Sequence, residues 1–536
     1  MSKLGSQRSG FFSRWMPAGL ILLAFALRLI NLAGRPLWYD EAFAILYAEK
    51  NLAAILSGTL TPVQGAASDV HPVAFYFLVH GWMTLVGQTP LAVRMFSVIY
   101  GVGTVALVYR MMRDLFSERV AQWSALIVAI APFQIAYSQE ARMYAMLGFW
   151  SMAALAAFAC AWKSDTLRAW LAFVACGALA LYSHNLAFAM FAALGVWVVA
   201  RAVLPLIVPA SQRDRNTPEA RQRWRLAYEL AMAAPLMVLL FLPWLARVPG
   251  QLGKIGQAYW VTRPNATMLV QTLMAFTFDF ENAVFPRTLL PLALFGAVLA
   301  LTLVIWRILI HERTRGGAKS PGESLCCSWI NSGRVTLLAT LACAPVAIVF
   351  LVSQWLPVYI IRGLIPASIV YAVLVGWALG AMPRVARVMF GGPLGALVIA
   401  VLVAFYGYTG FPRGPYTSLD AFLRAQLQPG DVIIHSNKLT FFPAYVYDRT
   451  LPQVFLGDPP GSGSDTLARP TQEALGLFPT DLEVVTEGKS RVWLVIFRQA
   501  VEQAQGKHPH LAWLDAHFKR EQTFEFRDAE VMLFAR

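Results

Sequence analysis

Long apolar runs separated by short polar segments make up most of the chain up to residue 408. A membrane-spanning helix needs about 20 mostly apolar residues. Eleven segments meet this requirement, at about 15–34, 90–112, 119–137, 141–162, 167–183, 186–208, 227–246, 288–310, 335–356, 362–381 and 386–408. The apolar stretch 72–88 is shorter and adjoins the next span, so we interpret it as an interfacial or re-entrant helix. The pattern predicts a polytopic α-helical membrane protein.

The pattern changes after residue 408. "SLDAFLRAQL" has helical spacing, "VIIHS" and "RVWLVIF" are typical of buried strands, and "TFEFRDAEVMLF" alternates like a hairpin. We therefore expect residues 409–536 to form a small α/β domain, with a flexible loop at 457–466, "GDPPGSGSDT".

Composition agrees with a membrane protein. Of the 536 residues, 57% are hydrophobic and only 14% are charged, whereas a soluble globular protein has about 25% charged residues. The mean hydropathy is +0.54. The first apolar run follows a basic N-terminus without a convincing cleavage site. We therefore interpret 1–14 as a cytoplasmic N-terminus and 15–408 as the transmembrane domain, with an uncleaved first span.

Orientation follows from the distribution of Lys and Arg, which collect on the cytoplasmic side. With the N-terminus inside, the inner segments hold 21 of these residues and the outer segments nine. Eleven spans then place the near-neutral tail, with 13 basic and 15 acidic residues, outside. The net charge of +14 thus reflects topology and affinity for anionic lipid, and no basic stripe with stacking aromatics indicates nucleic-acid binding. We expect a bacterial inner-membrane protein.

Two adjacent acids, Asp40 and Glu41, begin the long outer loop 35–89, in "PLWYDEAF". The following segment, "EAFAILYAEKNLAAIL", has the spacing of one amphipathic helix along the membrane surface. Asp40 could therefore simply cap this helix, with Glu41 favouring its positive end. The alternative is a pair of functional acids, because both lie at the membrane edge beside Trp38 and Tyr39 and other ionisable residues share this face.

Further charges lie at the same rim. "APFQIAYSQEARMYAM" carries Glu140 and Arg142 between two spans. A cation in the first turn of a helix opposes the helix dipole, so a nearby carboxylate or a bound phosphate should offset Arg142. Arg362, in "WLPVYIIRGLIPA", is the only charge at its outer helix mouth. It could reach lipid headgroups or bind a ligand phosphate.

Additional candidates complete the outer face. Lys254 is a third possible phosphate ligand, and His71, Tyr39, Tyr144 and Trp260 are candidates for lining the site. No Cys or His spacing indicates a metal site. The rim acids could bind a divalent ion, but arginines would already neutralise a phosphate, so we expect no metal and no cofactor.

Several motifs together resemble a known family: "RPLWYDEA", "HPVAFYFLVH", "RMFSVIYG", "PFQIAYSQEARMYA" and "RGLIPA", in this order over roughly residues 15–380. The sequence resembles the GT-C integral-membrane glycosyltransferases, in particular protein O-mannosyltransferases and lipid A aminoarabinose transferases. The resemblance implies a membrane fold of eleven or more spans that takes a sugar from a polyprenyl-phosphate carrier on the extracytoplasmic side.

The resemblance also implies roles for individual residues. Asp40 matches the catalytic base, while Glu41 and Glu140 match the family's other acids. Arg142 and Arg362 match basic residues that meet the donor phosphate. The acceptor could be a lipid, a polysaccharide or a protein.

The chain departs from the family pattern at two donor-contact motifs. It has His71-Pro72-Val73 where relatives often have "HPP", and Arg362-Gly363 where they often have "RY". We nevertheless expect an inverting hexosyl or pentosyl transferase with a carboxylate base. The alternative is a transporter or flippase of lipid-linked saccharide, which the absence of repeated halves and of mid-span charges other than Arg28 disfavours.

Overall fold

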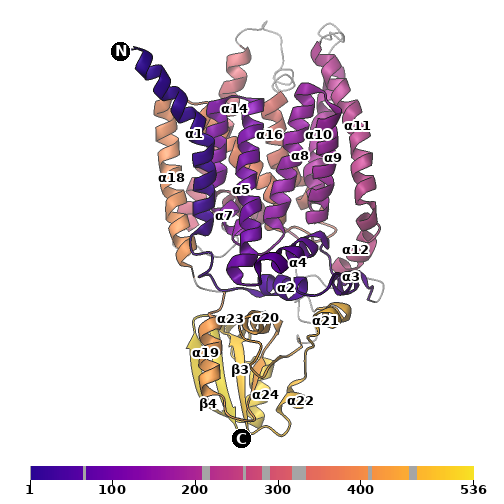
Figure 1. Ribbon diagram of the computed structural model, residues 1–536, viewed down its shortest axis with the longest axis vertical. Helices are drawn as coiled ribbons and strands as arrows, with labels where there is room; N and C mark the ends of the chain where they lie inside the picture. Colours follow the sequence, from indigo (N-terminus) through magenta and orange to yellow (C-terminus); the bar gives the residue numbers. More distant parts are fainter. Residues whose placement is uncertain are drawn as a thin grey trace. The chain divides into compact units, whose positions relative to one another are not determined.

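The computed structural model describes residues 2–63, 68–207, 218–257, 261–279, 290–316, 333–408, 413–457 and 467–536. Most of the loop expected at 457–466 lies outside these ranges. The chain divides into two compact units (Figure 1). The helical unit comprises Met1–Ile30, Ser97–Val248 and Val261–Tyr406, and the tail unit comprises Asn31–Phe96, Pro249–Trp260 and Gly407–Arg536.

All eleven segments expected to span the membrane are helical. The helices are α1 (Ser2–Leu29), α5 (Pro90–Leu115), α6 (Glu118–Ile130), α7 (Pro132–Ser138), α8 (Tyr144–Ser164), α9 (Leu167–Ser183), α10 (Ala187–Ile207), α11 (Pro218–Leu245), α14 (Leu290–Gly316), α16 (Gly333–Val352), α17 (Ile365–Gly380) and α18 (Arg384–Gly407). The 3₁₀ helix η4 (Ile361–Leu364) precedes α17, and α12 (Val248–Gln257) and α13 (Ala266–Phe278) follow α11. The prediction of a polytopic helical membrane protein is confirmed.

The number of spans stays a prediction. Within the described residues, seven helices are long and apolar enough to cross a membrane, and α6 with α7, bent by 57°, makes an eighth. The apolar part of α1 (Trp15–Leu29), α9 and the apolar part of α10 are shorter. Pro132 begins α7 and causes the bend, because proline offers no backbone N–H to continue the helical hydrogen bonds.

Helix α17 forms the centre of the helical unit, since its apolar window is entirely buried, whereas those of α11 and α18 are only 22% buried. Gly376 lets α17 approach α6 closely. A Cβ at this position would lie 2.4 Å from the backbone of Ser124. The exposed apolar faces of the outer helices match the lipid contact expected for an integral membrane protein.

Arg28, the mid-span charge noted in the sequence, has a structural role. It is fully buried, and its Nε donates to Ser138 Oγ at 3.0 Å. Its Nη1 donates to the carbonyl oxygens of Ala24 at 3.0 Å and Ala129 at 3.1 Å. Ala129 is among the last four residues of α6, whose carbonyls have no partner within their own helix. Arg28 therefore stabilises the bend between α6 and α7.

The tail unit begins with three short helices, α2 (Tyr39–Ala48), α3 (Leu52–Leu60) and α4 (Ala74–Val86). The prediction of one amphipathic surface helix after Asp40 is wrong. The chain breaks between α2 and α3, where the Asn51 side chain accepts from the backbone N–H of Ala54 at 2.8 Å and caps α3. Every residue of α2 from Glu41 to Ala48 is buried, so this helix is a core element.

The α/β domain expected after residue 408 is confirmed. Its strands are β1 (Val432–His435), β2 (Gln453–Phe455), β3 (Arg491–Phe497), β4 (Lys519–Phe526) and β5 (Ala529–Ala535), in the order β2-β1-β3-β5-β4. The first three are parallel, and β5 is antiparallel to both β3 and β4. Helices α19 (Tyr416–Gln426), α20 (Lys438–Tyr447), α21 (Arg469–Leu475), α22 (Leu482–Thr486), α23 (Arg498–Gln503) and α24 (Pro509–His517) complete it.

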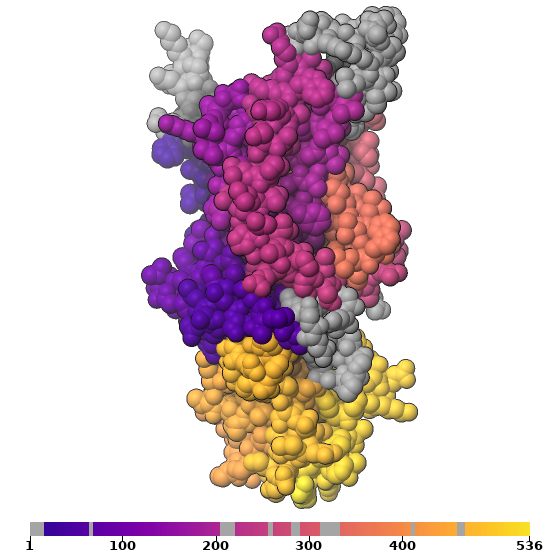
Figure 2. Space-filling view, turned by 90° about the vertical axis from the view of Figure 1, so that its right-hand side faces the viewer, coloured from indigo at the N-terminus to yellow at the C-terminus, as the bar shows by residue number. Residues whose placement is uncertain are grey.

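Segment 31–96 packs directly on this domain, and Figure 2 shows the two in contact, the segment in indigo to violet and the domain in orange to yellow. Tyr39 of α2 stacks on Phe442 of α20 with ring centroids 5.5 Å apart. The Thr471 hydroxyl of α21 donates to the carbonyl of Gly58 in α3 at 2.8 Å. The first loop and the C-terminal domain therefore share one core.

Candidate active site

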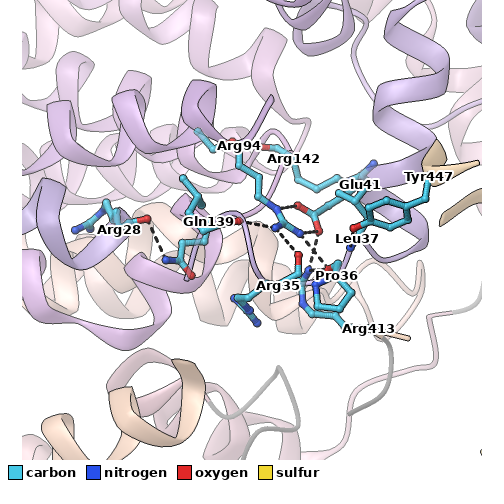
Figure 3. Close-up of polar contacts among 12 residues, drawn as sticks. Arg28, Arg35, Pro36, Leu37, Glu41, Arg94, Gln139, Arg142, Arg413 and Tyr447 are labelled. Atoms are coloured by element: carbon cyan, nitrogen blue, oxygen red, sulfur yellow. Dashed lines mark hydrogen bonds and ion pairs between the residues drawn. The ribbon is translucent and has the colours of Figure 1, made fainter. Parts of the chain in front are cut away.

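Glu41 lies in the first turn of α2 and is fully buried. Its Oε1 accepts from Arg94 Nε at 2.7 Å, and its Oε2 accepts from Arg94 Nη2 at 2.8 Å and from Arg413 Nη1 at 2.7 Å (Figure 3). Arg94 is fully buried as well, and the Arg413 side chain is 5% exposed. We call Glu41, Arg94 and Arg413 the Glu41 clamp. Removing the Glu41 carboxylate would leave two buried cations without their anion, which is strongly destabilising.

The Glu41 clamp also holds the irregular segment that leads into α2. Arg94 Nη1 donates to the carbonyls of Leu32 and Arg35, both at 2.7 Å. The carbonyl of Pro36 accepts from Arg94 Nη2 at 3.1 Å and from Arg413 Nη1 at 3.0 Å. The Leu37 N–H donates to Tyr447 Oη at 3.0 Å. Backbone groups outside regular structure need such partners when buried, so these bonds fix the chain path before Asp40.

Asp40 lies one residue before Glu41 and is partly exposed, unlike its neighbour. The helix cap is Trp38, which makes no side-chain capping bond, so Asp40 is not the cap of α2. The two adjacent acids thus occupy different surroundings: Glu41 is a fully buried member of an ion-pair cluster, whereas Asp40 is partly exposed although its Oδ2 is buried.

His71 also belongs to the tail unit. Its Nδ1 lies 2.9 Å from Asp69 Oδ1, which accepts from the backbone N–H of His71 at 3.1 Å as well. Asp69 therefore orients the imidazole, in the way that a carboxylate orients histidines in many sites.

Glu140 and Arg142 lie in the helical unit, in the turn between α7 and α8, and are 2% and 4% exposed. The Arg142 N–H donates to the Glu140 carbonyl at 2.8 Å, and Ser97 Oγ donates to the Arg142 carbonyl at 3.4 Å. Arg142 precedes Met143, the N-cap of α8. The expectation that Arg142 lies inside the first turn of a helix is therefore wrong, because α8 begins two residues later. Arg142 still lies near the positive end of α8.

Arg362, in η4, meets the start of α8. Its guanidinium lies 5.6 Å from the ring centroid of Tyr144, the first residue of α8. The Tyr144 ring is in turn 6.0 Å from that of His184. The structure thus brings Arg362, Tyr144 and His184 together at the end of the helical unit where Arg142 precedes α8.

Comparisons with known proteins add to this geometry. Residues 70–207 match the family model for dolichyl-phosphate-mannose-protein mannosyltransferases. No curated protein matches the sequence. Among solved structures, ArnT from Cupriavidus metallidurans in the apo state has a TM-score of 0.58 and 12% sequence identity, over 96% of this chain and 97% of that one. ArnT bound to undecaprenyl phosphate gives the same values. This similarity shows that the fold is shared.

A further solved structure is the oligosaccharyltransferase of Archaeoglobus fulgidus tethered with an acceptor peptide. It is 15% identical over 94% of this chain and 72% of that one, and its TM-score of 0.49 adds no support. The family match over residues 70–207 and the shared ArnT fold together support a glycosyltransferase of the GT-C type.

Two candidate residues of this glycosyltransferase are not described. The side chain of Lys254 and all of Trp260 lie outside the described parts of the chain. Within the described parts, no group of three or more His, Cys, Asp or Glu side chains is placed to hold a metal ion.

Sequence reasoning missed the partners of the candidate acids in the glycosyltransferase. Arg94, Arg413 and Asp69 all bind candidate residues, yet none was singled out. Arg94 is one of the nine basic residues of the outer segments, and Arg413 is one of the 13 basic residues of the tail. Their isolation in "LAVRMF" and "GFPRGP" was the available indication, because a lone arginine beside apolar residues usually has a buried partner.

Proposed function

We propose that this glycosyltransferase moves a sugar from a polyprenyl-phosphate donor to an acceptor hydroxyl on the extracytoplasmic face, with inversion. Two relatives support the donor class: the matching family is described by dolichyl-phosphate-mannose, and ArnT has been solved bound to undecaprenyl phosphate. Both carriers are isoprenoid chains that end in phosphate.

Asp40 is the proposed general base. The acceptor oxygen attacks the anomeric carbon and forms a new C–O bond, its proton passes to Asp40, and the bond between the anomeric carbon and the phosphate oxygen breaks. Attack opposite the leaving phosphate inverts the configuration, by the same geometry as in inverting glycosidases. A positioned base of this kind contributes typically 10²–10⁴-fold to the rate.

The Glu41 clamp is the observation that carries this assignment. A base must be held within hydrogen-bond reach of its proton, and Asp40 adjoins a buried carboxylate bound by two arginines. The clamp also fixes the carbonyls of Arg35 and Pro36 just before α2. Glu41 is therefore proposed as a positioning residue, and Asp40, which is only partly buried, as the acid that meets the acceptor.

Arg142 and Arg362 are the proposed ligands of the donor phosphate, with Lys254 as a third cation. The contact of Arg362 with Tyr144, two residues after Arg142, supports a common role for both arginines. Preorganised cations stabilise the negative charge that develops on the leaving phosphate. Glu140 is proposed to orient Arg142 or the acceptor, and Tyr39, Tyr144, His71 and Trp260 to line the site.

The test is glycosyl transfer by the full-length protein in membranes supplied with a polyprenyl-phosphate sugar. Asp40→Asn should lower transfer by about 10²–10⁴-fold, since the amide cannot accept the proton, while donor binding persists. Glu49→Gln, at the other end of α2, is the matched control and should retain transfer. Unchanged turnover in Asp40→Asn would exclude Asp40 as the base. Movement of intact donor across the membrane without transfer would favour a flippase.

The phosphate ligands are tested separately. Arg362→Ala should weaken donor binding, and donor affinity equal to that of the wild type would mean that Arg362 only reaches lipid headgroups.

We also propose that the N-terminus lies in the cytoplasm and that residues 409–536 lie outside a bacterial inner membrane. Labelling of Ser418→Cys, an exposed position of α19, by an impermeant reagent from outside intact cells would check this orientation.

A further inference from the structure

The helical unit contains a cavity of about 470 Å³ between α6, α13, α14, α17 and α18. Its lining is almost entirely apolar and includes Leu126, Phe278, Val375 and Leu394. The hydroxyls of Thr277 and Tyr371, which also line it, lie 3.0 Å apart and bond to each other. The volume is within the range of about 300–1,000 Å³ that is usual for small-ligand sites.

The cavity is a slot parallel to the helices. Its lining residues on α18 run from Arg384 to Val398, a rise of about 21 Å at 1.5 Å per residue. On α17 they run from Tyr371 to Leu379, and on α6 from Trp123 to Ala131. A long, narrow, apolar space fits an extended hydrocarbon chain better than a compact ligand.

Glycines of α18 keep the slot open. Gly391, Gly392 and Gly395 line it near the middle of the helix. Glycine in a helix interior is unfavourable and is usually explained by close contact with another helix. That reason fails for Gly392 and Gly395, because a Cβ added at either would meet no atom within 4 Å. Their missing side chains leave volume for a ligand.

One end of the slot is cationic. Arg384 and Arg387 line it where α17 ends and α18 begins. Arg387 donates to the carbonyls of Leu379 at 3.0 Å and Met382 at 2.7 Å, and lies 5.3 Å from the ring centroid of Trp123. Arg384 is exposed and makes no hydrogen bond or ion pair with another described residue. Arg387 is thus fixed by protein, and Arg384 is placed to pair with an external anion.

We propose that the slot binds one hydrocarbon chain of an anionic phospholipid, whose phosphate lies at Arg384 and Arg387. Charge complementarity selects an anionic headgroup, and the apolar lining selects the chain. The cationic end of the slot is separate from the proposed donor site. Arg362 precedes α17 and Leu379 lies near the end of α17, so Arg362 and this end of the slot are about 25 Å apart along the helix axis.

The headgroup is tested on the full-length protein, delipidated in detergent and titrated with phosphatidylglycerol or phosphatidylethanolamine of equal chain length, with bound lipid counted by native mass spectrometry. Phosphatidylglycerol should bind more tightly. Arg384→Gln should lower the affinity for phosphatidylglycerol about fivefold, as expected for one arginine at an anionic lipid surface. The affinity for phosphatidylethanolamine should not change. Equal binding of the two lipids to the wild type would overturn the proposal.

The slot itself is tested by filling it. Gly395→Leu places a side chain in the cavity and should abolish the tight phosphatidylglycerol site. Gly19→Leu in α1 is the matched control, because a Cβ there also meets nothing within 4 Å and Gly19 does not line the slot. Wild-type binding by Gly395→Leu would exclude the slot. Displacement of phosphatidylglycerol by a lower concentration of undecaprenyl phosphate would mean that the occupant is a polyprenyl phosphate. These outcomes do not depend on glycosyl transfer, because no turnover is measured.

Discussion

The two acid-bearing turns of this glycosyltransferase, residues 32–41 and 137–144, are held by different chemistry. In the tail unit, charged groups hold the turn: Arg94 and Arg413 bind both the Glu41 carboxylate and the carbonyls before α2. In the helical unit, the described bonds go to neutral acceptors: Gln139 Nε2 donates to the carbonyls of Arg28 at 3.0 Å and Ile30 at 2.8 Å, and Arg28 Nε donates to Ser138 Oγ at 3.0 Å.

The two turns depend on different distant parts of the chain. Glu41 and Arg413 are 372 positions apart, so the first turn requires the C-terminal residues to be folded. The second turn is held by helices α1, α7 and α8, and Arg28 adds bonds to the bend itself. Breaking a buried ion pair by removing one partner costs more than losing a neutral hydrogen bond, which ranks the effects of mutation.

Removal of the Glu41 carboxylate should have the largest effect on stability. Glu41→Ala leaves two buried guanidinium groups without their anion, and about 3–5 kcal/mol of folding free energy should be lost. Denaturant unfolding of the tail unit, followed by fluorescence of Trp493 in β3, would measure it. A loss below about 1 kcal/mol, the value of a surface pair, would mean that the clamp is not a structural element.

Arg413 should have the next largest effect, because Glu41 keeps Arg94 when Arg413 is removed. Arg413→Gln should cost about 1–3 kcal/mol, as for a buried charged hydrogen bond. Arg449→Gln is the matched control. Arg449 also joins the C-terminal domain to the first loop, through Glu49 at 2.7 Å, but its side chain is 41% exposed, so about 0.2–1 kcal/mol is expected. Equal effects of the two variants would contradict the role of burial.

Gln139→Ala tests the support of the turn 137–144. It removes the bonds to the carbonyls of Arg28 and Ile30 and should cost about 0.5–1.5 kcal/mol per bond, less than Glu41→Ala. Thermal unfolding of the helical unit in detergent is the measurement. If Gln139→Ala were more destabilising than Glu41→Ala, the ranking of charged above neutral support would be reversed.

Asp420 in α19 extends this comparison, because it is a buried carboxyl to which no arginine among the described residues donates a hydrogen bond. It is 3% exposed, and neither oxygen has a hydrogen-bond partner among the described residues. Burial, together with the charge of Asp448, raises its pKa to about 8 from 3.8. The folded state therefore binds the proton more tightly than the unfolded state, and stability falls as pH rises from about 4 to about 8.

Asp420→Asn should remove this pH dependence and stabilise the protein at pH 8 while changing little at pH 4. Unfolding midpoints of the full-length protein at the two pH values would measure it. A wild type whose stability rises over this window, with no change in Asp420→Asn, would show that Asp420 is ionised throughout.

Local patterns predicted the elements well. All eleven apolar runs are helices, the continuous apolar runs of the tail form β1 and β3, and its alternating segment forms β4 and β5. The break at Glu49–Asn51 was missed, because the helical spacing of apolar residues continues across it while the Asn51 cap starts a new helix. The burial of α2 was missed as well, since its partner α20 lies about 400 residues later in the chain.

The candidate site was predictable only in part. The sequence indicated Asp40, Glu41, Glu140, Arg142 and Arg362 from their position at helix ends. The local pattern did not distinguish Asp40 from Glu41, because both are neighbouring carboxylates at one helix end, and only the family resemblance gave them different roles. Only the positions of Arg94 and Arg413 separate the buried acid from the partly exposed one.

The sequence was sufficient to predict a helical membrane protein with an α/β tail, because the length of apolar segments and the alternation of residues in strands are local properties of the chain. Tertiary structure alone decided which acid is buried among arginines and which cations meet which rings. Those contacts join residues 53 and 372 positions apart, and a charge selects its partner by distance and burial in the folded chain, neither of which a local pattern contains.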